Sequence, residues 1–264
     1  MLTRKKSSDT LHTIFQGLHL NFTVEKMSLN IIVTAKQVID PETPASALRI
    51  NPELRSMEPP TSTAPVINGF DENAIEAALR IKEEQGGSIT VLSVGNSFAM
   101  DVIKKPLSMG CDELVLVQDD ALTGLDSNAS AHILLAAIQK LGGFDLILSG
   151  RQASDYDQAQ VPQMISEGLG IPCITIAKKI EVREKVVMVD RVLRDGFETV
   201  STQLPAVVTV SNELGSPRYP TLRGIMAASR KQPTVWTLDD LDVDQTNLSP
   251  KVELLELYIP ASEA

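Results

Sequence analysis

After residue 27, the pattern of hydrophobic and polar positions alternates between short apolar runs and amphipathic stretches. Residues 31–36 form an apolar, β-branched run that predicts a strand buried on both faces. Helical spacing of apolar residues follows from Asn68 to about Gln85, and Gly86-Gly87 predicts the end of that helix. Further strands are predicted at 88–94, 114–117 and 145–149, and further helices at 99–109 and 127–141. This order indicates βαβ units around a parallel sheet.

Two regions depart from the βαβ pattern. Residues 41–65 contain six prolines, which predicts an extended loop, because proline continues neither a helix nor a central strand. After residue 172 the β segments 174–177, 181–191, 198–204 and 206–210 follow one another without helices, and Asp195-Gly196 indicates a hairpin turn. The predicted fold class is therefore α/β, a mostly parallel nucleotide-binding sheet flanked by helices, with an antiparallel β extension and no second full domain.

Charge and composition exclude several classes of partner and site. The 264 residues carry a formal net charge of −10, which argues against nucleic acid or an anionic membrane as a partner. No run of about 18 apolar residues is present, so no membrane-spanning helix is predicted. Only Cys111 and Cys173 occur, without a Cys/His cluster, so we expect no structural metal and a reducing, cytoplasmic location.

The two ends of the chain differ from its centre. Residues 1–27 are expected to be a disordered or extra N-terminal extension, since Met27 immediately precedes the first strand. Residues 28–240 form the predicted α/β domain. Residues 241–264 are an acidic C-terminal tail with interspersed apolar residues, expected either to be a frayed terminus or to lie across a partner's surface.

Loops at the carboxyl ends of the parallel strands are the places where an anion could bind, because backbone N–H groups are free there. In the loop 150–160, Gly150 permits close backbone approach and Arg151 offers a guanidinium for phosphate. Asp155 and Asp157 would repel phosphate, so we expect them to cap backbone amides or to meet ribose hydroxyls. This pattern fits a nucleotide loop, and an ordinary polar connection remains the alternative.

Catalytic motifs are missing. The sequence lacks GxGxxG after its first strand, a Walker A motif and a GxSxG elbow. Its histidines are His12 and His19 in the extension and His132 inside a predicted helix, so no nucleophile–base pair can be named. These absences favour a carrier, a regulator or a partner subunit over a hydrolase.

Several segments in register resemble the β subunit of electron transfer flavoprotein. They are residues 32–40, 68–78, 150–153, 204–209 and 217–222, and the resemblance runs in order from Asn30 to about Asp244. It implies a heterodimer with an α subunit that binds the redox-active FAD. That heterodimer would pass electrons from flavin-dependent acyl-CoA-type dehydrogenases to a quinone oxidoreductase or another acceptor.

The resemblance also implies site residues. The β subunit would hold AMP, or a second FAD in electron-bifurcating members. The implied nucleotide-binding residues are Thr34, Asn68, Gly69, Phe70, Asp71, Val94, Gly150, Arg151, Gln152, Ala153, Ser154, Asp155, Tyr156, Asp157, Gln158, Ala159, Gln160 and Val161. A recognition loop over residues 210–219 would dock into dehydrogenases through Leu214, expected to be exposed, with Pro217, Arg218 and Tyr219.

Two other functions remain open at this point. One is an electron-bifurcating subunit with FAD in the β site, which the segments around Arg151 and Ala159 favour, whereas the bulk of Tyr156 and the lack of a small hydroxyl residue at Gln158 favour neither ligand. The other is a stand-alone adenine-nucleotide-binding sensor or enzyme, for which no catalytic group can be named.

Overall fold

One large sheet organises the molecule. The computed structural model describes residues 26–53 and 55–258, so the expected N-terminal extension lies almost entirely outside the described residues. Within them, nine strands form a sheet in the order β11-β10-β9-β12-β8-β1-β6-β7-β13. Their bounds are β1 Leu29–Thr34, β6 Gly87–Gly95, β7 Glu113–Gln118, β8 Leu146–Gly150, β9 Cys173–Arg183, β10 Val186–Leu193, β11 Gly196–Gln203, β12 Ala206–Val210 and β13 Thr234–Trp236.

The sheet is parallel except at one end. β9, β12, β8, β1, β6, β7 and β13 pair in parallel, whereas β10 pairs antiparallel with both β9 and β11. The predicted α/β class with an antiparallel extension is confirmed. The expectation for residues 206–210 is corrected: β12 lies inside the parallel core between β8 and β9. All five of its residues are buried, as a strand covered on both faces requires.

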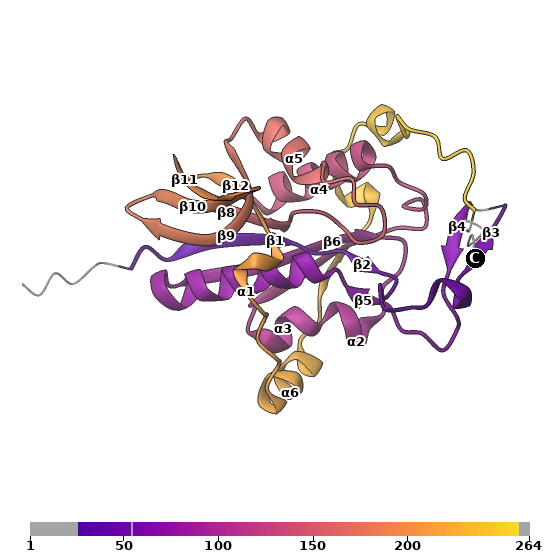
Figure 1. Cartoon of the computed structure of the whole chain (residues 1–264), viewed down its shortest axis with the longest axis horizontal. Coiled ribbons are helices and arrows are strands. Elements are labelled where there is room, and N and C mark those ends of the chain that lie inside the picture. Colours follow the sequence, from indigo (N-terminus) through magenta and orange to yellow (C-terminus); the bar gives the residue numbers. More distant parts are fainter. Residues whose placement is uncertain (1–25, 54, 259–264) are drawn as a thin grey trace, which may run out of the picture.

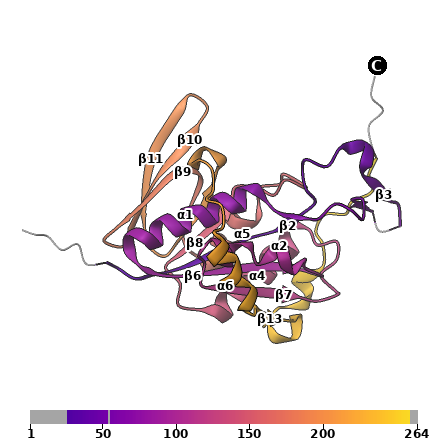
Figure 2. The same ribbon diagram turned by 90° about the horizontal axis from the view of Figure 1, so that it is seen from below.

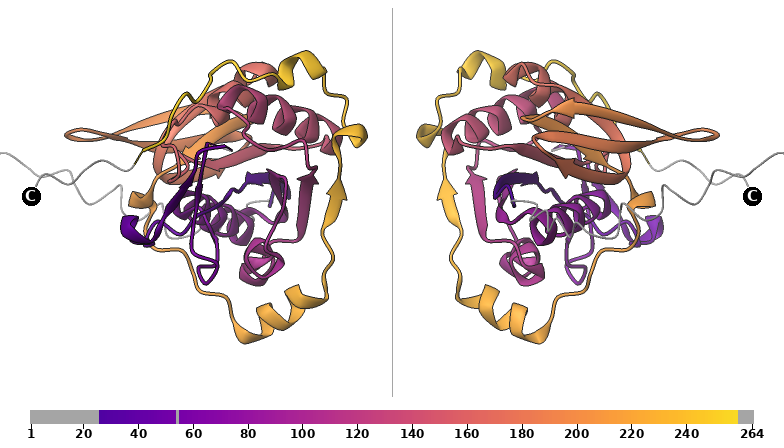
Figure 3. Two further views of the ribbon diagram at one scale, coloured as in Figure 1. Left: turned by 90° about the vertical axis from the view of Figure 1, so that its right-hand side faces the viewer. Right: turned by 90° about the vertical axis from the view of Figure 1, so that its left-hand side faces the viewer.

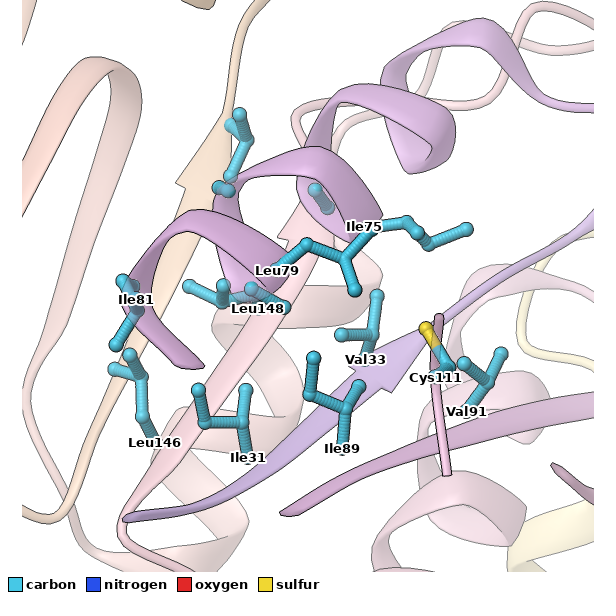
Figure 4. Close-up of a cluster of buried hydrophobic side chains, with 14 of the residues drawn as sticks. Ile31, Val33, Ile75, Leu79, Ile81, Ile89, Val91, Cys111, Leu146 and Leu148 are labelled. Atoms are coloured by element: carbon cyan, nitrogen blue, oxygen red, sulfur yellow. The ribbon is translucent and has the colours of Figure 1, made fainter. Parts of the chain in front are cut away.

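Helices cover both faces of the sheet (Figures 1 and 2). The helices are α1 Gly69–Gln85, α2 Met100–Ile103, α3 Lys105–Met109, α4 Ser127–Leu141, α5 Val161–Leu169 and α6 Leu222–Arg230. Buried residues of α1, α2, α3 and α6 share one apolar cluster, and those of α4 and α5 share the other. Successive β1 residues divide between the clusters, Ile31 and Val33 toward α1 and Ile32 toward α4, because side chains alternate along a strand. Figure 4 shows part of the α1 cluster.

Two predicted elements are divided in the structure. The predicted helix 99–109 is α2 followed by α3, because Pro106 lies in the first turn of α3 and cannot donate a backbone hydrogen bond to the preceding turn. The predicted strand 181–191 spans a hairpin between β9 and β10. Its turn residues, Glu184 and Lys185, have φ values of 48° and 65°. Neither is glycine or asparagine, so the sequence carried no turn signal there.

The proline-rich segment is more ordered than the predicted loop. Beside the short 3₁₀ turn η1 Ala45–Ala47, it contains the antiparallel hairpin of β3 Arg49–Asn51 and β4 Ser56–Glu58. Pro52 and Pro59 directly follow these strands and therefore leave their pairing intact. β2 Gln37–Val38 pairs antiparallel with β5 Val66–Ile67, which returns the chain to the end of β1.

The C-terminal segment runs back over the domain. After α6, β13 joins the free edge of β7, and the 3₁₀ turns η3 Leu238–Asp240 and η4 Gln245–Leu248 follow. Leu241 is buried in the α4 cluster, and Arg55 of the β3–β4 turn contacts Glu253 at 2.9 Å. Figure 3 shows this path from α6 along the rim of the sheet. Over the described ranges, no helix is long and apolar enough to cross a membrane.

Candidate functional site

The candidate nucleotide site lies where β1 and β8 end side by side. Thr34 and Ser149 occupy paired positions of these parallel strands, and their hydroxyl oxygens are 2.6 Å apart in a buried hydrogen bond. The β2–β5 pair brings Asn68 beside Lys36, and the Asn68 backbone N–H donates to the Lys36 carbonyl at 2.9 Å. The loop after β8 and the start of α1 therefore meet at this edge, as the sheet topology predicts.

Asp71 joins the three segments that meet at this edge. Its carboxylate accepts hydrogen bonds from the backbone N–H of Lys36 at 2.8 Å and of Gly150 at 3.0 Å. A Cβ on Gly150 would lie 2.4 Å from Asp71 Oδ1 and 2.7 Å from the Phe70 carbonyl carbon, so this position requires glycine. Burial raises the pKa of Asp71 to about 7 although these N–H donors favour the ionised form.

Asn68 fixes the first half of the loop. Its amide nitrogen donates to the Gln152 carbonyl at 2.8 Å, and its amide oxygen accepts from the Ser154 backbone N–H at 3.2 Å. The side chain is 1% exposed, so both bonds are shielded from water. Asn68 is thus a structural partner of the loop, and its amide is already engaged.

Arg151 and Asp155 carry buried polar atoms that lack a protein partner. The Arg151 guanidinium lies 4.8 Å from the centroid of the Phe70 ring, and its Nε is buried without a hydrogen bond. One Asp155 oxygen is 2.5 Å from Lys36 Nζ, and the other is buried and unpaired. Because buried polar atoms without a partner are costly, this pair of orphan atoms fits a site that is completed by a polar ligand.

Within the protein, the acidic residues of the loop contact polar side chains, and their expected contact with ribose hydroxyls stays a prediction. Asp155 pairs with Lys36, and Asp157 Oδ1 accepts from Gln152 Nε2 at 2.7 Å. Neither caps a backbone amide, because each finds a longer polar side chain that reaches across the loop. Asp157 has a φ of 50°, in the left-handed region, shortly before α5 begins.

The remaining expected residues occupy several environments. The stretch from Tyr156 to Gln160 is exposed, and Gln158 accepts a hydrogen bond from the Ser127 hydroxyl at the start of α4. Val161 is the first residue of α5, close to the predicted helix start, and Pro162 removes one N–H donor from that turn.

Val94 is half-buried and packs against the α4 cluster, and Gly69 is exposed at the start of α1. Ala153 is half-buried, and its carbonyl accepts from the Asp157 backbone N–H at 2.9 Å.

Most of the expected recognition loop lies against the domain. Leu214 is half-buried and packs against the α1 cluster, whereas we expected it to be exposed. The half-buried Pro217 and the engaged side chain of Arg218, which contacts Glu76 and Glu83, also lie against the domain. Only Tyr219 of the four expected docking residues projects, with 92% of its surface exposed.

An exposed apolar surface follows Tyr219 on α6. Leu222, Ile225 and Met226 are 74%, 51% and 56% exposed, and their i, i+3, i+4 spacing places them on one side of the helix. Figure 3 shows α6 at the periphery, far from the C-terminal 3₁₀ turns. The i, i+3, i+4 spacing of these residues is a signal for this surface that is visible in the sequence.

Comparison with known proteins assigns the family. The family model described as "Electron transfer flavoprotein domain" matches residues 61–241. An electron transfer flavoprotein subunit beta of Thermoanaerobacterium thermosaccharolyticum is 39% identical over 224 residues, covering 84% of each chain. The corresponding subunit of Clostridium acetobutylicum is 39% identical over 223 residues, again covering 84% of each chain. The chain belongs to the electron transfer flavoprotein β-subunit family.

Another member of this family works within a named complex. The Acetobacterium woodii protein named "Caffeyl-CoA reductase-Etf complex subunit CarD" is 37% identical over 214 residues, covering 81% of this chain and 80% of its own. The region matched by the family model contains the loop after β8, the start of α1 and the whole of α6. The family model therefore covers α6 and the β8 and α1 parts of the nucleotide site, whereas Thr34 and Lys36 precede the matched region.

Three further features of this family member bear on chemistry. Among the described residues, no group of three or more His, Cys, Asp or Glu side chains is placed to hold a metal ion. His132 lies half-buried within α4. Burial raises the pKa of Cys111 to about 12 and that of Cys173 to about 11, so neither thiol is activated as a nucleophile.

Proposed function

We propose that this chain is the β subunit of an electron-carrying heterodimer whose α subunit binds the redox-active FAD. The heterodimer accepts electrons from flavin-dependent acyl-CoA-type dehydrogenases and delivers them to a quinone oxidoreductase or another acceptor. Family membership supports this role. We place the carrier in the cytoplasm, where Cys111 and Cys173 remain reduced. The chain has no catalytic role of its own in this proposal.

In this proposal, an adenine nucleotide binds at the carboxyl edge of the sheet. The observation that carries it is the pair of buried, unpartnered polar atoms, Arg151 Nε and one oxygen of Asp155, within the loop that Asn68 and Asp71 hold. Arg151 supplies positive charge for a phosphate, and the first turn of α5 supplies N–H donors. AMP would be a structural ligand, whereas a second FAD would add a redox centre.

We favour AMP over a second FAD. AMP needs only a local anion pocket, which Arg151 and the start of α5 can provide. A second FAD needs an additional path for its isoalloxazine ring toward the α subunit. Arg151 and Ala159 lie in segments that resemble electron-bifurcating members, so the bifurcating function is the competing proposal.

Counting released nucleotides tests both proposals. The chain is co-expressed with its own α subunit, the purified complex is denatured, and the nucleotides are separated and quantified. One FAD and one AMP per heterodimer support the proposal, whereas two FAD support bifurcation. The variant Arg151→Gln should release less AMP while the FAD content stays unchanged, and Arg194→Gln, an exposed arginine of the β10–β11 turn, serves as the control. A stable monomer that binds nucleotide without any flavoprotein partner would instead support a sensor.

We also propose that α6 docks into the electron-donating dehydrogenase. Leu222, Ile225 and Met226 expose apolar surface, and Arg223 and Arg230 line a shallow hollow beside them. Electron-transfer complexes are small and transient, so a few apolar anchors can supply much of the affinity. Tyr219 adds an exposed aromatic ring at the entrance to the helix.

A further inference from the structure

Glu76 is a carboxylate in the buried row of α1. Its side chain is 6% exposed, and Arg80 Nε, one turn away, donates to its Oε1 at 2.8 Å. Arg218, which follows the loop after β12, donates to Oε2 through its Nε at 2.8 Å and its backbone N–H at 3.1 Å. Its Nη2 also donates to Oε1 at 3.2 Å. One carboxylate of α1 therefore holds both the side chain and the backbone of Arg218.

Two other side chains of α1 hydrogen-bond the loop between β12 and Arg218. Asn73 Nδ2 donates to the Gly215 carbonyl at 2.8 Å, and Arg80 Nη1 donates to the Leu214 carbonyl at 3.2 Å. Leu214 packs its side chain on the α1 cluster between these polar contacts. Hydrogen bonds fix direction as well as distance, so α1 determines the position and orientation of residues 214–218.

A gain in stability alone does not explain why a carboxylate occupies the buried position of Glu76. Burial disfavours its charge, yet hydrogen bonds from Arg218 and Arg80 hold its pKa below the usual range. A partly buried ion pair often adds little net stability compared with apolar residues of similar size, and its clearest role is to specify geometry. The geometry specified here is that of the chain leading directly into α6.

We propose that Glu76, through Arg218, positions α6 for docking to the dehydrogenase. The inference rests on the proposed docking role of α6 and assigns to Glu76 a positioning role in that function. Only three residues separate Arg218 from Leu222, so a displacement of Arg218 is transmitted to the apolar surface. Glu83 also contacts Arg218, but its side chain is exposed whereas that of Glu76 is buried.

The test measures electron transfer into the complete heterodimer. The probe is a butyryl-CoA dehydrogenase reduced by butyryl-CoA, and the KM for the heterodimer is measured together with kcat. The variants are Glu76→Gln, Leu222→Ala and their combination. We expect Glu76→Gln to raise KM about tenfold, equivalent to about 1.4 kcal/mol, while kcat, FAD content and the flavin spectrum stay unchanged. Glu72→Gln is the matched control, because Glu72 pairs with Lys105 on the same face of the domain.

The combined variant separates the possible outcomes. If Glu76 acts through α6, Glu76→Gln should change KM less than twofold once Leu222 is alanine, because coupled residues are not additive. Full additivity overturns the inference, as does an unchanged KM for Glu76→Gln while Leu222→Ala raises it. An unchanged KM for Leu222→Ala rejects the docking role of α6 itself. If Glu76→Gln folds poorly, Arg218→Lys keeps the charge, loses the guanidinium fork and should raise KM by itself.

Discussion

At the residue scale, the candidate site depends on buried polar side chains whose partners are backbone groups. Asp71 accepts two backbone N–H groups, and Asn68 bonds one N–H and one carbonyl of the loop after β8. Such bonds hold a loop at one distance from the sheet and leave other side chains, such as Arg151, available for a ligand. Asn68 and Asp71 therefore build the site, and their expected contact with a nucleotide stays a prediction.

Gly150→Ala should destabilise the protein. The added methyl group would overlap Asp71 Oδ1 and the Phe70 backbone, which cannot both move away. We expect a loss of about 2 kcal/mol in the free energy of unfolding, measured by urea denaturation of the heterodimer. Gly69→Ala is the control, because a Cβ there meets no atom within 4 Å. Equal stability of the two variants would contradict the close packing at Gly150.

The pKa of Asp71 predicts a pH dependence of stability. Its folded-state pKa of about 7 exceeds the ordinary value of 3.8, so between these values the folded chain retains a proton that the unfolded chain releases. The contribution of Asp71 to stability is therefore largest below pH 4 and falls as the pH rises toward 7. The free energy of unfolding of the wild type, minus that of Asp71→Asn, should decrease across this window. An increase would show that the N–H donors outweigh burial, and Asp101→Asn, on the exposed side of α2, supplies the baseline.

At the element scale, the local sequence around a residue does not predict whether its side chain is buried or exposed. Leu214 and Leu222 lie in similar turn-rich sequence, yet one packs on the α1 cluster and the other is 74% exposed. The difference arises because α1 offers polar and apolar partners to the loop, whereas the apolar side of α6 stays more than half exposed.

Leucine-to-alanine changes should separate these two roles. Leu214→Ala should lower the free energy of unfolding by about 1–2 kcal/mol, since it removes a half-buried side chain from a packed cluster. Leu222→Ala should leave stability within about 0.5 kcal/mol and raise the Kd for the dehydrogenase about tenfold or more. Thermal denaturation and titration of the heterodimer measure the two quantities. Reversed effects would restore Leu214 as the docking anchor.

Asp126 connects the first turn of α4 to the C-terminal segment. Its Oδ1 caps α4 by accepting from the Ala129 N–H at 2.8 Å, and its Oδ2 accepts from the N–H groups of Lys251 and Val252 at 2.5 and 3.1 Å. Asp126→Ala should lower the free energy of unfolding by about 1–2 kcal/mol, which is the usual effect of losing a helix cap. It should also speed amide exchange in residues 249–254. Asp244→Ala, which removes a cap from η4, should leave exchange in α4 unchanged.

At the scale of the whole molecule, apolar surface remains exposed at both ends of the domain. Leu193 and Phe197 lie exposed on the β10–β11 hairpin, and Val252, Leu255 and Tyr258 lie exposed on the C-terminal segment. The proposed α subunit is a partner that could cover such surface. The hairpin and the C-terminal segment extend from opposite sides of the sheet (Figures 1 and 2).

Co-expression with the α subunit should raise stability. A partner that binds only the folded state shifts unfolding by mass action, so the heterodimer should melt at a Tm several degrees above that of the isolated chain. The isolated chain should also contain no redox-active flavin. Differential scanning calorimetry and absorbance spectra provide the measurements. An identical Tm with and without the α subunit would argue against an obligate heterodimer.

The sequence by itself determined the parallel core, because apolar runs and amphipathic stretches specify buried strands and one-sided helices wherever they occur. The helix over residues 127–141 and the loop opening at Gly150 followed from local pattern and end signals. Only the tertiary structure decided the place of β12, the hairpin turn at Glu184 and the exposure of Leu222. Each of these depends on which distant segment lies alongside, and the periodicity of one segment does not encode its neighbour.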